Sequence, residues 1–101
     1  AELWPHVQAR AELAIGRSLG ALGEPDAARE VLQRALALSE ANGFRYYQLA
    51  AHLELLKVAD DPSVRDRHAR VASGLGRSLA ANLPKDDADR FLVHHGLPTG
   101  P

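Results

Sequence analysis

The stretch GRSLGALGEPDAARE, residues 16–30, carries three glycines within eight residues, and a proline and an acidic residue follow them. A glycine-rich loop that binds phosphate follows a β-strand and opens a helix, but the residues before Gly16 have a helical pattern. We therefore interpret Gly16 as a close crossing point between two helices. Gly23 is interpreted as the end of the first helix, because glycine adopts a positive φ without steric cost. The stretch thus predicts a helical hairpin and no nucleotide site.

Helical periodicity extends over the whole chain, and no segment alternates with the period of a strand. The fold class is predicted to be all-α, with helices over residues 5–22, 25–42, 44–59, 62–82 and 86–95. Proline, glycine and aspartate separate these segments, as at Asn42-Gly43 and Asp61-Pro62. Because the connections are short, successive helices are expected to lie antiparallel. The tail, residues 97–101, is expected to be frayed.

The spacing of apolar residues predicts which face of each helix is buried. In the first helix, the predicted face consists of Ala11, Ile15, Leu19 and Leu22. The faces predicted for the next three helices are Ala28, Val31, Leu32, Ala35 and Leu38, then Tyr46, Leu49, Ala50, Leu53 and Leu56, then Val64, Val71, Ala72, Leu75 and Leu79.

Composition excludes several classes of protein. The net charge of the 101 residues is −1, so no global field attracts nucleic acid or an anionic membrane. Cysteine is absent, which excludes a disulfide framework, a zinc thiolate site and a thiol nucleophile. No apolar run approaches the length of a membrane span. We expect a cytoplasmic protein, and the high alanine, arginine and glycine usage indicates a bacterial source.

The spacing of Gly16, Leu19, Gly23, Ala28, Leu32, Ala35 and Leu36 resembles a tetratricopeptide (TPR) repeat, a helix-turn-helix unit of 34 residues with small residues where its helices cross. Glu12 and Glu40 depart from the pattern, since the family usually has an aromatic residue and a proline there.

The resemblance divides the chain, as a single domain of residues 1–101, into a first repeat (9–42), a divergent second repeat (43–83), a terminal capping helix (84–96) and the tail. It implies stacking as a short right-handed superhelix. Gly16, Gly23, Ala28, Ala35 and Ala50 then hold structural positions at turns and helix crossings.

In TPR arrays the first helices of successive repeats line a concave groove that binds a peptide or a helix. The resemblance implies that Arg10, Leu13, Arg17, Tyr47, Ala51 and Glu54 face this groove. Two arginines and a tyrosine suit a peptide with a carboxylate and an apolar anchor. The chain is therefore predicted to be a non-catalytic protein–protein interaction module of a larger bacterial regulatory protein.

Other chemistry has little support in the sequence. The histidines form no i, i+4 pair for a metal, and they are interpreted as solvated or capping residues. Asp86, Asp87 and Asp89 begin a helix, where acids stabilise the dipole. The sequence contains no recognisable pattern of a catalytic triad, so we predict no enzymatic activity, no metal and no cofactor.

Two alternatives to peptide binding stay open. Arg65, Arg67, Arg70 and Arg77 make the fourth predicted helix basic, which would suit a regulatory or nucleic-acid-associated domain. No aromatic residue lies among them to stack on a base, so nucleic acid is the less favoured partner. The chain is alternatively a capping or dimerisation element, with a homodimer formed through the N-terminal end around Trp4.

Overall fold

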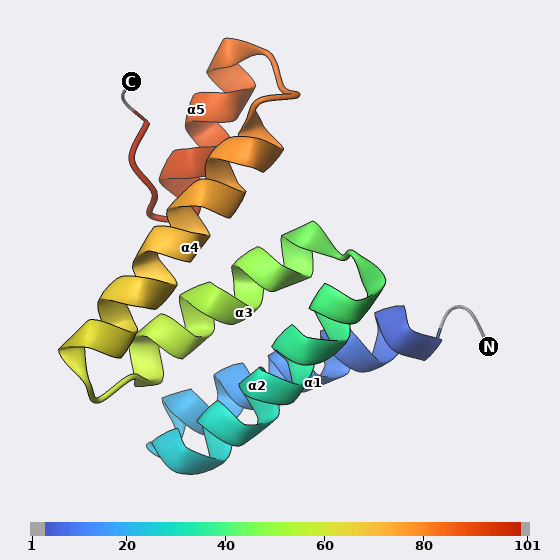
Figure 1. Cartoon of the computed structure of the whole chain (residues 1–101), viewed down its shortest axis with the longest axis vertical. Coiled ribbons are helices and arrows are strands. Elements are labelled where there is room, and N and C mark those ends of the chain that lie inside the picture. The colour runs from blue at the N-terminus through green and yellow to red at the C-terminus, as the bar shows by residue number, and fades with distance from the viewer. Residues whose placement is uncertain (1–3, 100–101) are drawn as a thin grey trace.

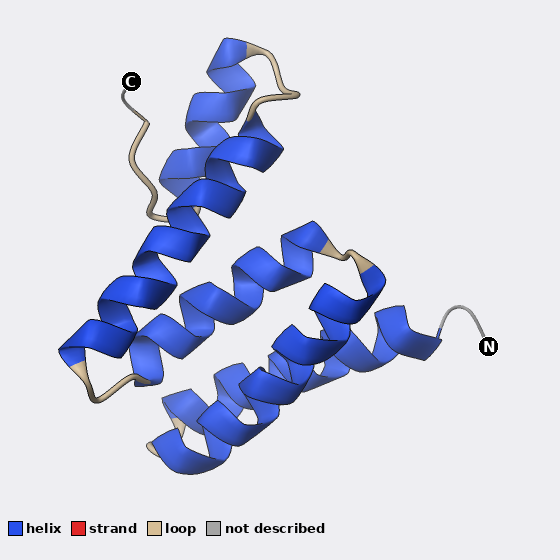
Figure 2. Ribbon diagram, in the orientation of Figure 1, coloured by secondary structure: helices blue, strands red, loops and turns tan. Residues whose placement is uncertain are grey.

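The computed structural model describes residues 4–99, which are all-helical as the sequence predicts (Figure 2). The five helices in this range are α1 (Trp4–Ala21), α2 (Pro25–Asn42), α3 (Arg45–Val58), α4 (Pro62–Ala80) and α5 (Lys85–His94). Each predicted helix is present, and no strand forms in the described range. None of these helices has the length and apolar character needed to cross a membrane.

Each helix packs on the next one along the chain, and α1 also contacts α3. The result is a flat molecule of 38 × 37 × 20 Å. In Figure 1, α1 and α2 form one hairpin, α3 lies on it, and α3 and α4 form a V that is joined at their connecting turn. Helix α5 lies beside the C-terminal half of α4. Helix α3 is therefore the central element.

Helices α1 and α2 approach closely at Gly16. An added Cβ atom at this glycine would lie 2.5 Å from Cδ2 of Leu32, which is fully buried. Ala28 and Ala35 on α2 are also fully buried, so small residues allow the two backbones to come together. This crossing is the centre of a first apolar cluster, formed by Leu13, Ala28, Leu32, Ala35, Leu36, Ala51 and Leu55.

The turns follow their local sequence signals. Gly23 and Gly43 adopt φ values of +77° and +70° at the ends of α1 and α2. After α2, the amide of Phe44 donates to the carbonyl of Ser39 at 2.9 Å, which closes a Schellman motif. Asp61 caps α4 by accepting a 2.9 Å hydrogen bond from the amide of Ser63, a bond that lowers the pKa of its carboxyl.

A second apolar cluster joins α3, α4 and α5, and it consists of Leu49, Ala72, Ala80, Leu92 and Leu97. Leu97 is only 9% exposed and sits over Gly76 of α4, where a Cβ atom would collide with Leu97 Cδ1. Its amide donates to the carbonyl of Leu92 at 2.8 Å. The expectation of a frayed tail is therefore wrong at Leu97, which is part of the core; residues 100 and 101 lie outside the described range.

The predicted buried face of α1 is correct only at Leu19, which is partly buried against the first apolar cluster, and Ala11 is exposed. Ile15 and Leu22 are 51% and 76% exposed, whereas Ala9, Leu13 and Gly16 are buried. The close approach of α2 selects the face with small residues, because only that face admits Leu32. Large apolar residues are thereby left on the outside of α1.

Two further residues depart from their predicted faces. Tyr46 is 49% exposed and Val71 is 40% exposed. Helix α3 buries Ala51, His52 and Leu55 instead, since it packs between two neighbouring helices and contributes to both apolar clusters.

Candidate functional site

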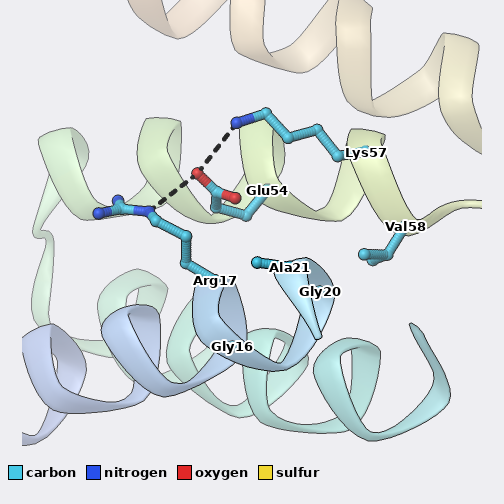
Figure 3. Close-up of a pocket in the computed structure, with 7 residues that line it drawn as sticks. All are labelled: Gly16, Arg17, Gly20, Ala21, Glu54, Lys57 and Val58. Atoms are coloured by element: carbon cyan, nitrogen blue, oxygen red, sulfur yellow. Dashed lines mark hydrogen bonds and ion pairs between the residues drawn. The ribbon is translucent and has the colours of Figure 1, made fainter. Parts of the chain in front are cut away.

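Three hollows follow one another along the face that α1 and α3 share, and we call them together the α1–α3 trench. The first hollow, of about 410 Å³, is lined by His6, Gly43, Phe44, Arg45, Tyr46, Tyr47 and Leu79. The second, of about 200 Å³, is lined by Arg10, Leu13, Ala14, Arg17, Tyr46, Tyr47 and Ala50. The third, of about 250 Å³, is lined by Gly16, Arg17, Gly20, Ala21, Glu54, Lys57 and Val58 (Figure 3). Neighbouring hollows share lining residues, so the three hollows lie next to one another along this face.

An ion pair crosses the trench between the second and third hollows. Arg17 Nε of α1 lies 3.2 Å from Glu54 Oε2 of α3, and Lys57 Nζ lies 3.4 Å from the same oxygen (Figure 3). The Glu54 side chain is 13% exposed, whereas that of Arg17 is 62% exposed. One carboxylate thus serves two cations, which leaves an excess of positive charge at this point.

Arg10 adds further positive charge one hollow away. Its side chain is exposed on α1, and within residues 4–99 it forms no ion pair. Arg45 at the other end donates a hydrogen bond to the hydroxyl of Ser78 at 3.3 Å. The trench therefore offers the guanidinium groups of Arg10 and Arg45, neither of which pairs with a carboxylate within residues 4–99, to acidic ligands.

Aromatic rings form the wall of the first hollow. Tyr47 packs against His6 and Phe44, with ring centroids 5.2 Å and 5.8 Å away. The Tyr47 hydroxyl and His6 Nε2 are hydrogen-bonded at 3.1 Å. This contact joins α1 to α3 and fixes the tyrosine ring, so the hollow has an apolar wall with defined geometry.

The aromatic wall continues to α5 through Tyr46. The rings of Tyr46 and His95 are 5.7 Å apart, and Phe91 lies 4.7 Å from His95. Burial and the neighbouring His94 lower the pKa of His95. Because Tyr46 is half exposed and lines two hollows, it is the aromatic surface that a ligand in the trench would meet.

Four of the six residues expected to face the groove have accessible side chains or line the trench at its surface: Arg10, Arg17, Tyr47 and Glu54. Leu13 contributes to the floor of the second hollow but is only 5% exposed. The expectation for Ala51 is wrong, since it is fully buried in the first apolar cluster. At this position α3 presses against α2, and a methyl side chain is enclosed.

Sequence reasoning missed Tyr46, Phe44, His6 and Leu79, which line the trench from α3, its preceding turn, α1 and α4. The adjacent pair Tyr46-Tyr47 carried a signal. Neighbouring residues on a helix point about 100° apart, so the two rings cannot both enter one apolar face. No sequence signal marked Leu79 as a lining residue, because its position depends on how α4 lies against α3.

The histidine interpretation is wrong for His52 and His68. Both are buried between α3 and α4, and their Nδ1 atoms are 2.9 Å apart. Burial, helped by His68 and Arg67, lowers the pKa of His52 to about 4, and burial lowers that of His68 too. Two ligands alone do not make a metal site, and the described residues contain no cluster of three or more such groups.

The arginines of α4 are exposed as expected. Arg67, Arg70 and Arg77 fall within a narrow arc of the helix, while Arg65 points elsewhere and donates to the carbonyl of Ala59 at 3.2 Å. They face no hollow described for residues 4–99.

Comparison with known protein families, curated proteins and solved structures gives no match to this chain.

Proposed function

We propose that the chain is a protein–protein interaction module that binds an extended acidic segment of a partner protein in the α1–α3 trench. The observation that carries this proposal is the succession of three adjacent hollows, which share Tyr46, Tyr47 and Arg17 as lining residues. An extended peptide advances about 3.3 Å per residue, so a ligand along two helices of this length makes contacts at many successive residues.

Charge determines the class of ligand. Arg10, Arg17 and Lys57 outnumber Glu54 along the trench, and Arg45 stands at its aromatic end. Guanidinium groups bind carboxylates with two parallel hydrogen bonds, which gives geometric selectivity as well as energy. Acidic side chains or a terminal carboxylate of the ligand would lie in the second hollow, between Arg10 and Arg17.

The aromatic end determines a second feature of the ligand. Tyr46, Tyr47 and Leu79 surround the largest hollow of the trench and offer apolar surface for one anchoring side chain. A bulky apolar residue of the peptide would fill this hollow, because fixed aromatic rings bind with little loss of side-chain entropy. The proposed ligand is therefore an acidic segment with one apolar or aromatic anchor.

The proposal includes the arrangement that the TPR resemblance implies, a right-handed superhelix in which α1 and α3 are equivalent groove helices. It also includes a non-catalytic role in the cytoplasm, within a larger bacterial regulatory protein. The composition supports the bacterial setting, and the TPR-like spacing of residues 16–36 supports the role.

The test is a binding titration with labelled synthetic peptides rich in aspartate and glutamate, each made with and without one phenylalanine. Fluorescence anisotropy is expected to show saturable binding that is tighter for the phenylalanine-containing peptide. The double variant Arg10→Ala with Arg17→Ala is expected to weaken binding at least about tenfold, since a charge-assisted contact contributes about 1.5–3 kcal/mol.

Arg67→Ala with Arg70→Ala is the matched control, because it removes the same charge from α4. This control is expected to retain binding, and the helical circular dichroism signal of all proteins is expected to be unchanged. Equal losses in both double variants would show unspecific attraction. Amide shifts in NMR spectra confined to α4 would place the ligand on α4. Either result would refute the trench as the site.

A further inference from the structure

Helix α1 carries an apolar stripe on the side opposite to the core. The stripe consists of Trp4, Val7, Ala11, Ile15 and Leu22, and all five are exposed. At 100° per residue they fall within an arc of about 80°. The buried residues Ala9, Leu13 and Gly16 lie on the far side of the helix. The stripe is therefore a second apolar face, separate from the face that packs on α2.

None of the five residues of the stripe is charged, and Arg10 lies at its edge, where it lines a hollow together with Val7 and Ala11. The residues between its members on the same side are Gln8 and Ser18, which are uncharged. At its edge, Glu12 is paired with Arg34 of α2 across 3.6 Å. Trp4 is 71% exposed and Leu22 is 76% exposed, so the two ends are as open as the middle. A long, uncharged apolar stripe of this kind marks an interface with another apolar helix.

Four of the five residues of the stripe are symmetric about position 13; the fifth, Val7, would face Leu19, which packs against the first apolar cluster. In an antiparallel pair of α1 helices, Trp4 would face Leu22 of the second copy, and Ala11 would face Ile15 of the second copy. A hollow of about 310 Å³ lined by Val7, Arg10 and Ala11 lies where the Ile15 side chain of the second copy would enter. In this arrangement the large side chain of Ile15 faces the small side chain of Ala11 and enters the hollow beside it. Helices that pack ridges into grooves make contacts of this kind.

We infer that this chain forms a twofold symmetric dimer through antiparallel contact of its α1 stripes, with Ile15 of each copy seated in the Val7–Ala11 hollow of the other. Judged from their exposed fractions, the large side chains of the stripe offer at most roughly 500 Å² per copy, so the dimer would bury up to about 1,000 Å², the lower limit for a specific interface. The contact shares Arg10 with the second hollow of the trench, and the other residues that line the trench lie outside it.

Sedimentation equilibrium of the 101-residue chain over micromolar to millimolar concentrations tests the inference. The average mass is expected to rise from 10.9 kDa towards twice that value. Ile15→Glu places two like charges near the twofold axis, and it is expected to raise the dissociation constant of the dimer about a hundredfold or more. Val93→Glu is the control, since Val93 is an exposed aliphatic residue on α5.

Disulfide trapping then tests the register, which is straightforward because the chain has no cysteine. A mixture of Ala11→Cys and Ile15→Cys proteins is expected to form the mixed disulfide dimer faster than either protein alone forms its own. A parallel pair would instead trap Ile15→Cys with itself and overturn the inference. A chain that stays monomeric at all concentrations would also overturn it and would assign the stripe to a helix of a different protein or segment.

Discussion

Gly16 of α1 and Leu32 of α2 share one space: the position that a Cβ atom would take at Gly16 is 2.5 Å from Cδ2 and 2.6 Å from Cγ of Leu32. The second distance matters more, because Cγ is not the free end of the side chain and Leu32 is fully buried. Leu32 therefore cannot turn away without displacing its neighbours in the first apolar cluster.

Gly16→Ala is expected to lower the free energy of unfolding by about 1–3 kcal/mol, although alanine is the better helix former, since overpacking costs more than propensity gains. Gly16→Leu is expected to lower the melting temperature further. Gly74→Ala is the control in chemical denaturation: this α4 glycine has open space around its Cβ position, so the substitution is expected to raise stability by up to about 1 kcal/mol. A neutral Gly16→Ala variant would contradict the close crossing.

Gly76 and Leu97 are the equivalent pair in the second cluster, and a double-mutant cycle tests their coupling. Gly76→Ala alone is expected to destabilise the protein, because Leu97 is displaced. Leu97→Ala alone is expected to cost about 2 kcal/mol through lost burial. In the Leu97→Ala background, Gly76→Ala is expected to be neutral or stabilising. Additive effects in urea denaturation would show that Leu97 does not pack on Gly76.

The helix bounds could be predicted because they depend on local signals. Pro25, Gly43 and Asp61 each act within one turn of their own position, through a fixed φ, a left-handed conformation and a side-chain cap. The close crossing at Gly16 could be predicted for the same reason. A glycine inside a helix is unfavourable, so its presence indicates that a neighbouring element leaves no space for a side chain. Residues 15–19, IGRSL, are similar to residues 75–79, LGRSL. The glycine has the same structural role in both segments, because Leu32 packs on Gly16 and Leu97 packs on Gly76.

The face of α1 could not be predicted because the helix has apolar residues on two sides. Periodicity favours the side with Ile15 and Leu22, which has the larger residues, but α2 packs on the side with Ala9 and Gly16. Close approach outweighs the area of individual side chains there. The Tyr46–His95 contact lay beyond periodicity for a different reason, since it joins residues from two helices that are far apart in the chain.

The buried pair His52–His68 predicts that acid destabilises the fold. Burial lowers the pKa of His52 in the folded state to about 4, against 6.5 for the ordinary side chain, so the unfolded state binds more protons between these values. The contribution of His52 to the free energy of unfolding is therefore fully present above about pH 6.5. It falls as the pH drops below this value, and the loss levels off below about pH 4. His52 alone is expected to contribute a loss of roughly 2 kcal/mol at about pH 5, and His68 acts in the same direction.

Urea denaturation at several pH values measures this loss. His52→Gln is expected to flatten the dependence between about pH 7 and pH 5, because one titrating group is removed. His94→Gln, at an exposed position on α5, is the control for the remaining groups. If the two variants lose stability equally with acid, the buried pair is not the cause.

Glu12 predicts a substitution that strengthens the fold. Its side chain is only 14% exposed, Arg34 lies 3.6 Å from Oε1, and Oε2 is buried without a hydrogen-bond partner among the described residues. A buried polar atom without a partner costs about 1–3 kcal/mol, and Arg34 retains Glu30 as a second partner. Glu12→Met keeps the length of the side chain and removes the carboxylate, so we expect it to raise the free energy of unfolding by about 1 kcal/mol. Glu12→Gln keeps polar atoms in the same place and is expected to give no gain. A Met variant that is less stable than the Gln variant would show that the Glu12–Arg34 contact outweighs the burial of the charge.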